Sequence, residues 1–526
     1  MLILYETTLL LDRTCPAVVE SQKEVLRSGN IRKFSFERGG RHMMHVNSGT
    51  YRVLSEQDLS QIHQAALTVL ARTGVQVDSE PFLAILSDVG CKVEKDGRVK
   101  IPPEVVAGAL EKVPNRVVLH GRGEVSPLDL GERRVHLGTG GAAVNILDLD
   151  SGEVRDPTLA DLGDIAWLVH NLENIHFLLR PVVARDVPPE ILDINKFYTC
   201  LANTNKHVMA SAGSPESAKE VIELAEMVAG GKEELQDRPI ISFVTSWMIS
   251  PLKLDLKSAE VLSTVIESGL PVALSSAPVT GSTAPATLAG LLVQVHAEEL
   301  SGIVLTQAVR AGAPVLYGPV PAVADMRTMN YLGGAIESAL LNAACVQLGG
   351  LIDVPTYSDA GLTDSKLPDI QAGYEKAANI ILVAMAGGNY IHHSAGMLES
   401  MLTVAYEQFV IDNDINGMAL RALQGIRVDE DTLATEVIER VGPGGNYLTQ
   451  RHTLDHIRGD EYYLPATADS RSRESWEQAG SLDARERARE IARELLTKER
   501  PNLIPLGIDE QIRNRFHIVA PKRAAK

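Results

Sequence analysis

A regular alternation of short apolar runs and longer amphipathic stretches occupies the middle of the chain. Seven of the runs are of strand length and rich in β-branched and aromatic residues, while the stretches between them repeat their apolar positions at helical spacing. The predicted strands are 176–183, 207–212, 240–247, 271–277, 314–320, 352–358 and 389–395. The predicted helices are 159–171, 188–204, 215–229, 256–268, 284–311, 332–348, 369–387 and 399–424.

An eighth strand is available just ahead of this alternation. The text RVHLGTGGAAVNILDLDSG alternates in polarity and ends in a DSG turn, which predicts a hairpin around residues 134–155. Strands that alternate with helices build parallel β/α units, and eight of them close a barrel. A doubly wound open sheet is the main alternative, but no G-x-G-x-x-G turn occurs. We therefore predict an α/β chain with a (β/α)8 TIM-type barrel at residues 131–427.

The flanking segments differ in character from the barrel. Residues 44–130 read as a helical N-terminal segment, whose first helix begins after Ser55 with Asp58 three residues on, a loose capping box. Residues 428–526 form a C-terminal extension that contains the charged helix SLDARERAREIARELLTKER. Residues 1–43 fit nothing that follows, so we expect a non-native or disordered extension, with the native start at Met43 or Met44.

Charge and cysteine content exclude several classes of protein. Lys and Arg number 50 against 68 Asp and Glu, and no local basic stripe is present, which argues against nucleic acid as a partner. No apolar run reaches the roughly 18 residues of a membrane span. The four cysteines, Cys15, Cys91, Cys200 and Cys345, form no ligand cluster, which is typical of a reduced cytoplasmic protein.

Polar residues end every predicted strand. Barrel enzymes carry their active sites at the C-terminal ends of the strands, and core packing alone would keep choosing Val, Ile or Leu there. The sequence therefore predicts a polar mouth. We expect the mouth to be lined by Arg180-Pro181, Ser211, Thr245-Ser246-Trp247, Ser275-Ser276, Tyr317-Gly318-Pro319, Tyr357-Ser358-Asp359 and His392-His393-Ser394.

The loop LGTGGAAVN is the first stretch with candidate chemistry. Gly138, Gly140 and Gly141 would let the backbone approach a ligand or cofactor closely, and Asn145 ends the loop. A plain glycine hairpin explains the same letters equally well.

The second stretch is YSDAGLTDSKLPDIQAGYEKA, around the sixth β/α loop. Asp364 or Ser365 could simply cap the following helix. The polar candidates in it are Asp359, Asp364, Asp369, Gln371, Tyr374 and Glu375.

The third stretch, YIHHSAGMLES, contains the adjacent pair His392 and His393. Neighbouring residues of an extended strand point to opposite faces, so only one of the two histidines is expected inside. Barrel metal sites recruit three or more His and carboxylate ligands. We therefore expect no metal, although one of these histidines with Asp359 is the arrangement that would hold one.

The remaining motifs narrow the chemistry further. No G-x-S-x-G elbow, P-loop or HExxH occurs. The possible walls of the mouth include Phe243, Trp247, Tyr357, Tyr374 and Tyr390. Aromatic faces with a few acids suit a quaternary ammonium, which cannot donate hydrogen bonds and is attracted by ring quadrupoles.

Taken in order along residues 53–480, these stretches resemble the trimethylamine methyltransferase family. The carrying text is IHQAALTVLARTGVQVD, VKIPPEVVAGALEKVP, HLGTGGAAVNILD, SDAGLTDSKLPDIQAGYEK, HHSAGMLESMLTVAYEQFVIDNDI and GPGGNYLTQRHTLDHIR, with a later Trp476. The resemblance implies a transfer of a methyl group from an amine to the Co(I) of a cobalamin (corrinoid) held by a separate corrinoid protein.

The founding members of that family carry pyrrolysine, whereas every position here is an ordinary residue. The resemblance is therefore to the branch that acts on quaternary amines such as glycine betaine, proline betaine, carnitine or γ-butyrobetaine. We expect no tightly bound cofactor and a homo-oligomer. The alternatives are a metal-dependent barrel hydrolase or lyase and a non-catalytic betaine-binding barrel.

The candidate residues are assigned from strand-end position and from the resemblance. We expect His392 or His393, with Asn145 or Arg180, to hold a substrate carboxylate. The candidate catalytic residues are Asp364, Gln371, Tyr374 and Glu375. The candidate substrate-binding residues are Asn145, Arg180, Phe243, Tyr317, Tyr357, Asp359, Tyr390, His392 and His393, and the candidate cofactor-binding residues are Gly138, Gly140 and Gly141.

Overall fold

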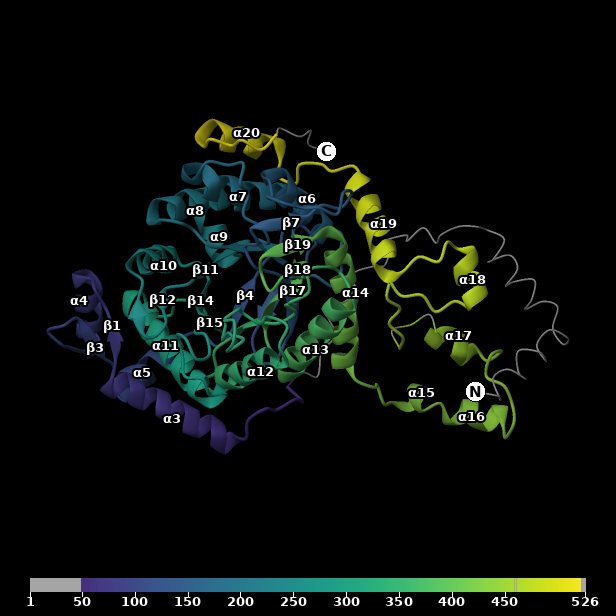
Figure 1. The fold of residues 1–526 in the computed structure, drawn as a ribbon, viewed down its shortest axis with the longest axis horizontal. Helices are drawn as coiled ribbons and strands as arrows, with labels where there is room; N and C mark the ends of the chain where they lie inside the picture. Colours follow the sequence, from purple (N-terminus) through teal and green to yellow (C-terminus); the bar gives the residue numbers. More distant parts are fainter. Residues whose placement is uncertain (1–48, 458, 460, 522–526) are drawn as a thin grey trace. The chain divides into compact units, whose positions relative to one another are not determined.

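Eight parallel strands form the centre of the computed structural model, which describes residues 49–457, 459 and 461–521 (Figure 1). Their order in the sheet follows the chain, and a parallel bridge between Tyr317 and Thr356 joins the two ends of the sheet. The predicted TIM-type barrel is therefore confirmed. The strands are β6 (His136–Thr139), β9 (Phe177–Leu179), β10 (His207–Ala210), β11 (Ile241–Thr245), β14 (Val272–Ser276), β15 (Val315–Pro319), β16 (Tyr357–Asp359) and β17 (Tyr390–Ala395).

A helix follows each of these strands and covers the outside of the barrel (Figure 1). The last helix begins at Tyr406 rather than at residue 399, because residues 397–405 form two short strands instead. The helices are α6 (Leu159–His170), α7 (Pro189–Asn203), α8 (Pro215–Ala229), α10 (Leu256–Ser268), α11 (Leu288–Val309), α12 (Ile336–Leu351), α13 (Ile370–Ala386) and α14 (Tyr406–Gln424).

A short hairpin fills the N-terminal end of the barrel. It consists of β4 (Val117–Leu119) and β5 (Leu128–Leu130), and its apolar side chains pack against the barrel interior, including Met209 and Leu316. Its neighbours are the residues that start the strands, as in the hydrogen bond between His207 Nδ1 and the His120 carbonyl at 3.1 Å. This hairpin lies within the predicted helical N-terminal segment, where no strand was expected.

The segment ahead of the barrel otherwise contains the predicted helices. They are α3 (Glu56–Arg72), α4 (Glu80–Asp88) and α5 (Pro103–Leu110), with β1 (Val75–Gln76), β2 (Lys92–Val93) and β3 (Arg98–Lys100) between them. Ser55 and Asp58 form the predicted capping box at the start of α3. All three helices pack against α11, which is the single described helix long and apolar enough to cross a membrane and is 72% buried over its apolar window.

The predicted hairpin at 134–155 is divided between two sheets. Its first part is the barrel strand β6, whereas β7 (Asn145–Leu147) and β8 (Val154–Arg155) form an antiparallel pair outside the barrel. They join β18 (Met397–Leu398) and β19 (Thr403–Ala405), which follow β17. This small sheet therefore lies beyond the C-terminal ends of β6 and β17.

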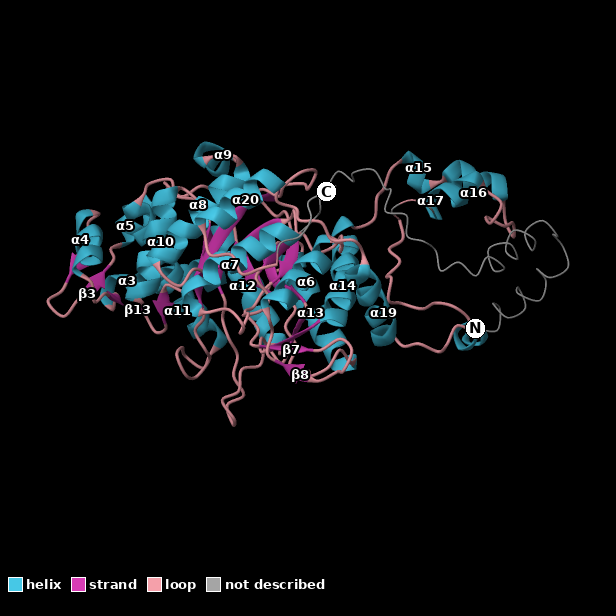
Figure 2. Ribbon diagram, turned by 90° about the horizontal axis from the view of Figure 1, so that it is seen from above, coloured by secondary structure: helices cyan, strands magenta, loops and turns pink. Residues whose placement is uncertain are grey.

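Among the residues described after the barrel, six helices are present (Figure 2). The predicted charged helix is α19, which packs on α14 through an apolar stripe that includes Ala488 and Ala492. Its residues Arg485 and Arg489 lie 3.2 and 3.7 Å from the buried Glu407 carboxylate. The helices are α15 (Glu430–Leu433), α16 (Thr435–Val441), α17 (Arg451–Ile457), α18 (Arg473–Gln478), α19 (Ala484–Thr497) and α20 (Leu506–Arg515).

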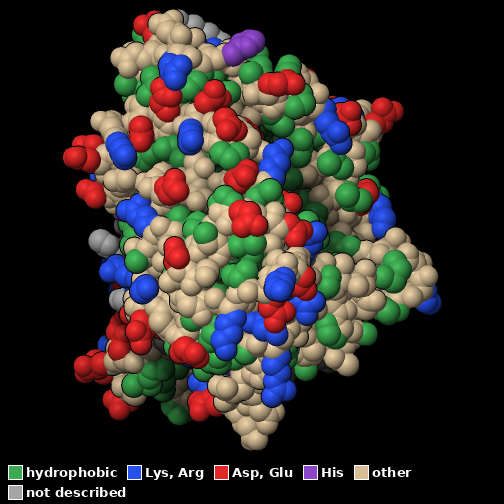
Figure 3. Space-filling view, turned by 90° about the vertical axis from the view of Figure 1, so that its left-hand side faces the viewer, with side chains coloured by type: hydrophobic (Ala, Val, Ile, Leu, Met, Phe, Trp, Pro, Cys, Tyr) green, Lys and Arg blue, Asp and Glu red, His purple; other side chains and the backbone are tan. Residues whose placement is uncertain are grey.

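Acidic and basic side chains are interspersed on the face of the protein drawn in Figure 3. Lys and Arg are most frequent in the lower part of that view, where acidic side chains lie among them, and the net charge of the chain is −18. The predicted extension and start site at residues 1–43 lie outside the described residues, and the domain boundaries stay a prediction.

Candidate functional site

Asp359 and His393 meet at the C-terminal end of the barrel. Asp359 ends β16, His393 lies in the neighbouring strand β17, and His393 Nδ1 is 2.8 Å from Asp359 Oδ1. An ionised carboxylate only accepts hydrogen bonds, so Nδ1 carries the hydrogen and donates it. This contact fixes the plane of the imidazole and directs its Nε2 away from the carboxylate.

His392 and His393 lie close together, contrary to the expectation that only one of them faces inside. Their ring centroids are 4.1 Å apart. The expectation assumed an extended strand, whereas His393 has a φ of 63° and the register of β17 against β6 shifts between Ile391 and Ala395. A bulge of this kind re-aims a side chain, so both rings contribute to one cluster.

The His392 ring is buried, with 1% of its surface exposed. Neither of its nitrogens has a hydrogen-bond partner among the described residues. Burial, with a smaller contribution from His393, holds the pKa of His392 well below its usual value. The imidazole is therefore neutral and has unused hydrogen-bonding and ligating capacity. One ligand atom from each of Asp359, His392 and His393 lies within 4.8 Å of the others.

Four aromatic rings form a stacked column inside the barrel. Phe177 and Tyr390 have centroids 3.6 Å apart, Tyr390 and Tyr357 5.7 Å, and Tyr357 and His392 3.9 Å. The faces of Tyr357 and Tyr390 are covered by their neighbours in the column. Tyr357 therefore packs against the His392 ring, and Tyr390 packs against Tyr357, so neither tyrosine presents an open face to an ammonium group.

Arg180 provides positive charge at the end of β9. Its Nη2 is 3.4 Å from Ser211 Oγ, and its Nε has no hydrogen-bond partner within the described part of the chain. Nearby, Lys196 Nζ donates to Asp193 Oδ1 and to the Ser211 carbonyl, each at 2.6 Å. Burial, together with the charge of Arg180, lowers the pKa of Lys196 to about 8. Two cations here face one carboxylate, so this side of the mouth favours an anion.

Asp364 and Glu375 tie three loops of the mouth together. Asp364 Oδ1 accepts from Ser400 Oγ at 2.6 Å and from the Gly333 amide at 2.9 Å. Glu375 Oε2 accepts from Thr363 Oγ1 at 2.6 Å and from the Asp364 amide at 2.9 Å. The loops after β15, β16 and β17 are thereby linked through these two carboxylates.

The two other residues of the predicted catalytic group differ in position. Gln371 Nε2 donates to Glu375 Oε1 at 2.9 Å and so belongs to the loop network. Tyr374, by contrast, lies at the surface of the protein, with 60% of the residue exposed.

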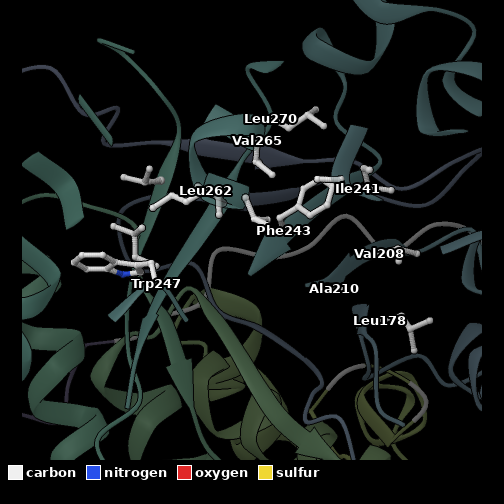
Figure 4. Close-up of a cluster of buried hydrophobic side chains, with 14 of the residues drawn as sticks. Leu178, Val208, Ala210, Ile241, Phe243, Trp247, Leu262, Val265 and Leu270 are labelled. Atoms are coloured by element: carbon white, nitrogen blue, oxygen red, sulfur yellow. The ribbon is translucent and has the colours of Figure 1, made fainter. Parts of the chain in front are cut away.

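Phe243 and Tyr317, two of the predicted substrate-binding residues, lie away from the mouth, whereas a third, Asn145, lies in the small sheet beyond the C-terminal end of β6. Phe243 points from β11 into the apolar layer beside α10, where Figure 4 shows it close to Val265. The Tyr317 hydroxyl lies 2.9 Å from Nδ1 of His296, on the outer side of β15. Asn145 pairs with Thr403 in the small sheet. Alternation along each strand turned Phe243 and Tyr317 to the helical side.

The three candidate cofactor-binding glycines are explained by packing within the protein. A Cβ atom at Gly138 would overlap the ring of Phe177, and one at Gly140 would overlap His393. A Cβ atom at Gly141 would overlap the side chain of Met397. Their small size thus makes room for neighbouring side chains of this chain, including the His393 ring of the cluster.

Sequence reasoning missed several polar residues that bear on the site. Tyr331 lies in the loop after β15, where burial and then the charge of Asp359 raise the pKa of its hydroxyl. Lys376 of α13 is fully buried and lies 3.2 Å from Asp412 of α14. It also donates to the carbonyls of Gly361 and Met397, in the loops after β16 and β17. Lys196, Lys376 and Asp412 lie within helices, so the pattern of polar strand ends does not indicate them.

The fold and the mouth define a barrel of the kind that carries its chemistry at the C-terminal ends of its strands. Residues 27–524 match the family described as Trimethylamine methyltransferase (MTTB). The chain belongs to this family and is a methyltransferase, which confirms the resemblance seen in the sequence.

Similar proteins are named for several different methylated amines. A glycine betaine methyltransferase of Desulfitobacterium hafniense (strain Y51) is 34% identical over 468 residues, which is 88% of this chain and 95% of the relative. A trimethylamine methyltransferase MttB of the same species (strain DSM 10664 / DCB-2) is 35% identical over 461 residues, 88% of this chain and 92% of the relative. The solved monomethylamine methyltransferase MtmB of Methanosarcina barkeri aligns with 84% of this chain and 93% of its own, at 12% identity and a TM-score of 0.47.

Proposed function

We propose that this methyltransferase moves a methyl group from a quaternary amine that bears a carboxylate to the cobalt of a corrinoid on a separate protein. Glycine betaine, proline betaine, carnitine and γ-butyrobetaine are the candidate substrates. One observation supports a quaternary amine over trimethylamine: the chain contains ordinary residues at every position, whereas the founding members of the family carry pyrrolysine. A glycine betaine methyltransferase is also among the similar proteins.

The chemistry of the leaving group favours a quaternary nitrogen. When a methyl group leaves as an electrophile, a quaternary ammonium becomes a neutral tertiary amine and needs no proton or additional electrophile. The corrinoid would supply the nucleophilic Co(I) that accepts the methyl group. The chain itself needs to bind the amine, orient one N-methyl group towards the open end of the barrel and exclude water.

The observation that carries this proposal is the excess positive charge at the end of β9. Arg180 has an Nε atom without a partner in the described structure, and Lys196 adds a second cation against the single carboxylate of Asp193. A buried guanidinium binds carboxylates through charge-assisted hydrogen bonds. We propose that Arg180 and the His392–His393 pair bind the substrate carboxylate together. Arg180 follows β9 and the two histidines lie in β17, and in the sheet β6 is the strand between β9 and β17.

The remaining predicted residues take supporting roles in this scheme. Asp359 orients His393, while Tyr357 and Tyr390 support the His392 ring through the aromatic column. Asp364, Gln371 and Glu375 position the loops that border the mouth. The glycines of β6 and its loop have their Cβ space filled by side chains of this chain, so they do not fit a role as a corrinoid cradle. We therefore assign the corrinoid to the partner protein.

We also propose a cytoplasmic homo-oligomer. The three described cysteines are free and buried, in keeping with a reducing compartment. Large apolar side chains are exposed in the segment that contains α15 to α17, which suits contact with another chain. They include Ile426, Val428, Leu433, Ile438, Leu448, Leu454, Ile457, Tyr462 and Leu464.

The decisive experiment follows methyl transfer to the corrinoid directly. The full chain is mixed with a reduced corrinoid protein and, in separate reactions, with the four carboxylated amines, choline, tetramethylammonium and trimethylamine. We expect the absorbance change of corrinoid methylation with at least one carboxylated amine, and little or none with the three amines that lack a carboxylate. A corrinoid spectrum that stays unchanged with all seven amines contradicts the proposal.

The Arg180 assignment predicts an effect on substrate binding. Arg180→Gln should raise the KM for the carboxylated amine by about 10–100-fold, because a lost hydrogen bond to a charged group costs about 1.5–3 kcal/mol. The kcat should change little. Arg185→Gln is the matched control, since Arg185 lies five residues further on with an exposed side chain. Equal KM values for Arg180→Gln and the control would remove Arg180 from the binding site.

A further inference from the structure

We propose that Asp359, His392 and His393 together bind a divalent transition-metal ion. One carboxylate and two imidazoles supply one ligand atom each, and these atoms lie within 4.8 Å of one another inside the barrel mouth. Ligand atoms about 2.0–2.2 Å from one ion lie at most about 4.4 Å apart, so small side-chain rotations suffice to close the site. The expectation of no metal rested on a single inward histidine, and the bulge in β17 removes that premise.

His392 is the observation that points to a ligand. It is 1% exposed, and neither ring nitrogen has a hydrogen-bond partner among the described residues. Buried polar groups in folded proteins are almost always paired, so a buried imidazole without partners calls for an explanation. Its ring is held between the face of Tyr357 and the ring of His393, with centroids 3.9 and 4.1 Å away. The ring is thus oriented in advance, as a metal ligand requires.

His393 reaches the cluster only through an unusual backbone. A φ of 63° is rare for a residue other than glycine. The ring also requires the absence of a side chain at Gly140, whose Cβ would overlap it. Two local departures from ordinary strand structure therefore combine to place one imidazole beside another. Such departures are concentrated at functional sites.

Asp359 is itself held by surrounding groups. Its backbone amide donates to Asn342 Oδ1 at 3.1 Å. His393 Nδ1 donates to one carboxylate oxygen at 2.8 Å, close to the separation of two ligand atoms on one ion, so a bound ion would displace this proton to solvent and be held by both atoms.

The donor set indicates which metals fit. Two imidazoles and one carboxylate suit Zn²⁺ or Co²⁺, and three protein ligands leave a coordination position open. The substrate carboxylate is the natural occupant of that position, a point that rests on the proposed function. The metal would also offset the charge of Asp359, which otherwise repels a carboxylate bound beside the histidines.

The experiment measures metal binding separately from methyl transfer. The full chain is freed of metal with a chelator, titrated with Co²⁺ and followed by the visible absorbance of the bound ion, and Zn²⁺ is then used to displace Co²⁺. The test variants are His392→Gln and Asp359→Asn, each checked for folding by thermal unfolding. The matched control is the double variant His452→Gln with His456→Gln, because these histidines and Asp431 form the second, more exposed group of possible ligands.

We expect one equivalent of Co²⁺ with tetrahedral or five-coordinate absorbance in the unmodified chain and in the control. Affinity should fall by at least about 100-fold in both test variants, since loss of a second-shell partner alone costs about 10–100-fold. Absence of stoichiometric binding, or equal affinity in folded His392→Gln, overturns the metal site.

The two proposals fail independently. Metal binding without methyl transfer from any quaternary amine would contradict the proposed function alone. Full methyl transfer by a protein that binds no metal would contradict the metal site alone.

Discussion

Lys376 and Asp412 show how single residues beneath the mouth hold it in place. Both side chains are fully buried, with their charged atoms 3.2 Å apart. Lys376 also donates to carbonyls in the loops after β16 and β17, while Asp412 accepts from the Gly396 amide at 2.7 Å. The pair therefore connects α13 and α14 to the two loops that follow Asp359 and the histidine pair. Burial makes this arrangement sensitive to the loss of either partner.

Removal of one partner of the Lys376–Asp412 pair should lower the free energy of unfolding more than removal of both partners. Lys376→Met leaves Asp412 as an unpaired buried charge, so the free energy of unfolding should fall by about 3–5 kcal/mol. The double variant Lys376→Met with Asp412→Leu should lose distinctly less. Urea unfolding of both variants measures this difference, with exposed Lys219→Met as the control for the loss of a lysine. Equal losses in the single and double variants would show that the ion pair is not coupled.

At the scale of elements, the loops after β15, β16 and β17 behave as one unit. Asp364 binds Ser400 and the Gly333 amide, and Glu375 binds Thr363 and the Asp364 amide. All three loops follow strands that border the Asp359–His392–His393 cluster. We infer that Asp364 acts by positioning these loops rather than by contact with substrate.

A comparison of two variants tests this role of Asp364. Asp364→Asn and Ser400→Ala both weaken the same 2.6 Å hydrogen bond, so each should lower kcat/KM for methyl transfer by a similar factor, about 5–10-fold. Ser263→Ala on α10 is the control, since Ser263 is hydrogen-bonded only within its own helix. A loss of 100-fold or more in Asp364→Asn with normal activity in Ser400→Ala would instead place Asp364 in contact with the substrate.

The elements that the sequence predicted are those whose pattern is local. Seven strands and their helices follow from apolar periodicity, and the cap at Ser55 follows from the spacing of Ser55 and Asp58. The three-residue strands of the β4–β5 hairpin were too short to show a period. The bulge at His393 depends on pairing with β6 and on space left by Gly140, which no local pattern records.

At the scale of the whole molecule, three buried histidines besides the His392–His393 pair lie around the barrel as neutral groups. His207 Nε2 is 2.7 Å from Ser242 Oγ within the barrel wall. His296 Nε2 is 2.9 Å from Nδ1 of His63, which belongs to the N-terminal segment, and His136 begins the first barrel strand. Burial lowers the pKa of His136 and His207 to about 4 and that of His296 to about 3. None of the three can be protonated without weakening the barrel or its contact with α3.

The lowered pKa values of these three histidines predict that acid destabilises the fold. Their folded pKa values lie below the unfolded value of about 6.5, so between pH 6.5 and about 4 the unfolded chain binds more protons than the folded chain. Stability is present above pH 6.5 and is lost as the pH falls, by up to about 4 kcal/mol per pH unit near pH 5 for three groups. Calorimetry at a series of pH values should show the midpoint of thermal unfolding falling steeply below pH 6.

His207→Asn should reduce the slope of this fall with pH, because it removes one titrating group, whereas His517→Asn near the C-terminus should leave the slope unchanged. An unfolding midpoint that is constant between pH 7 and pH 5 would contradict the neutral state of all three histidines.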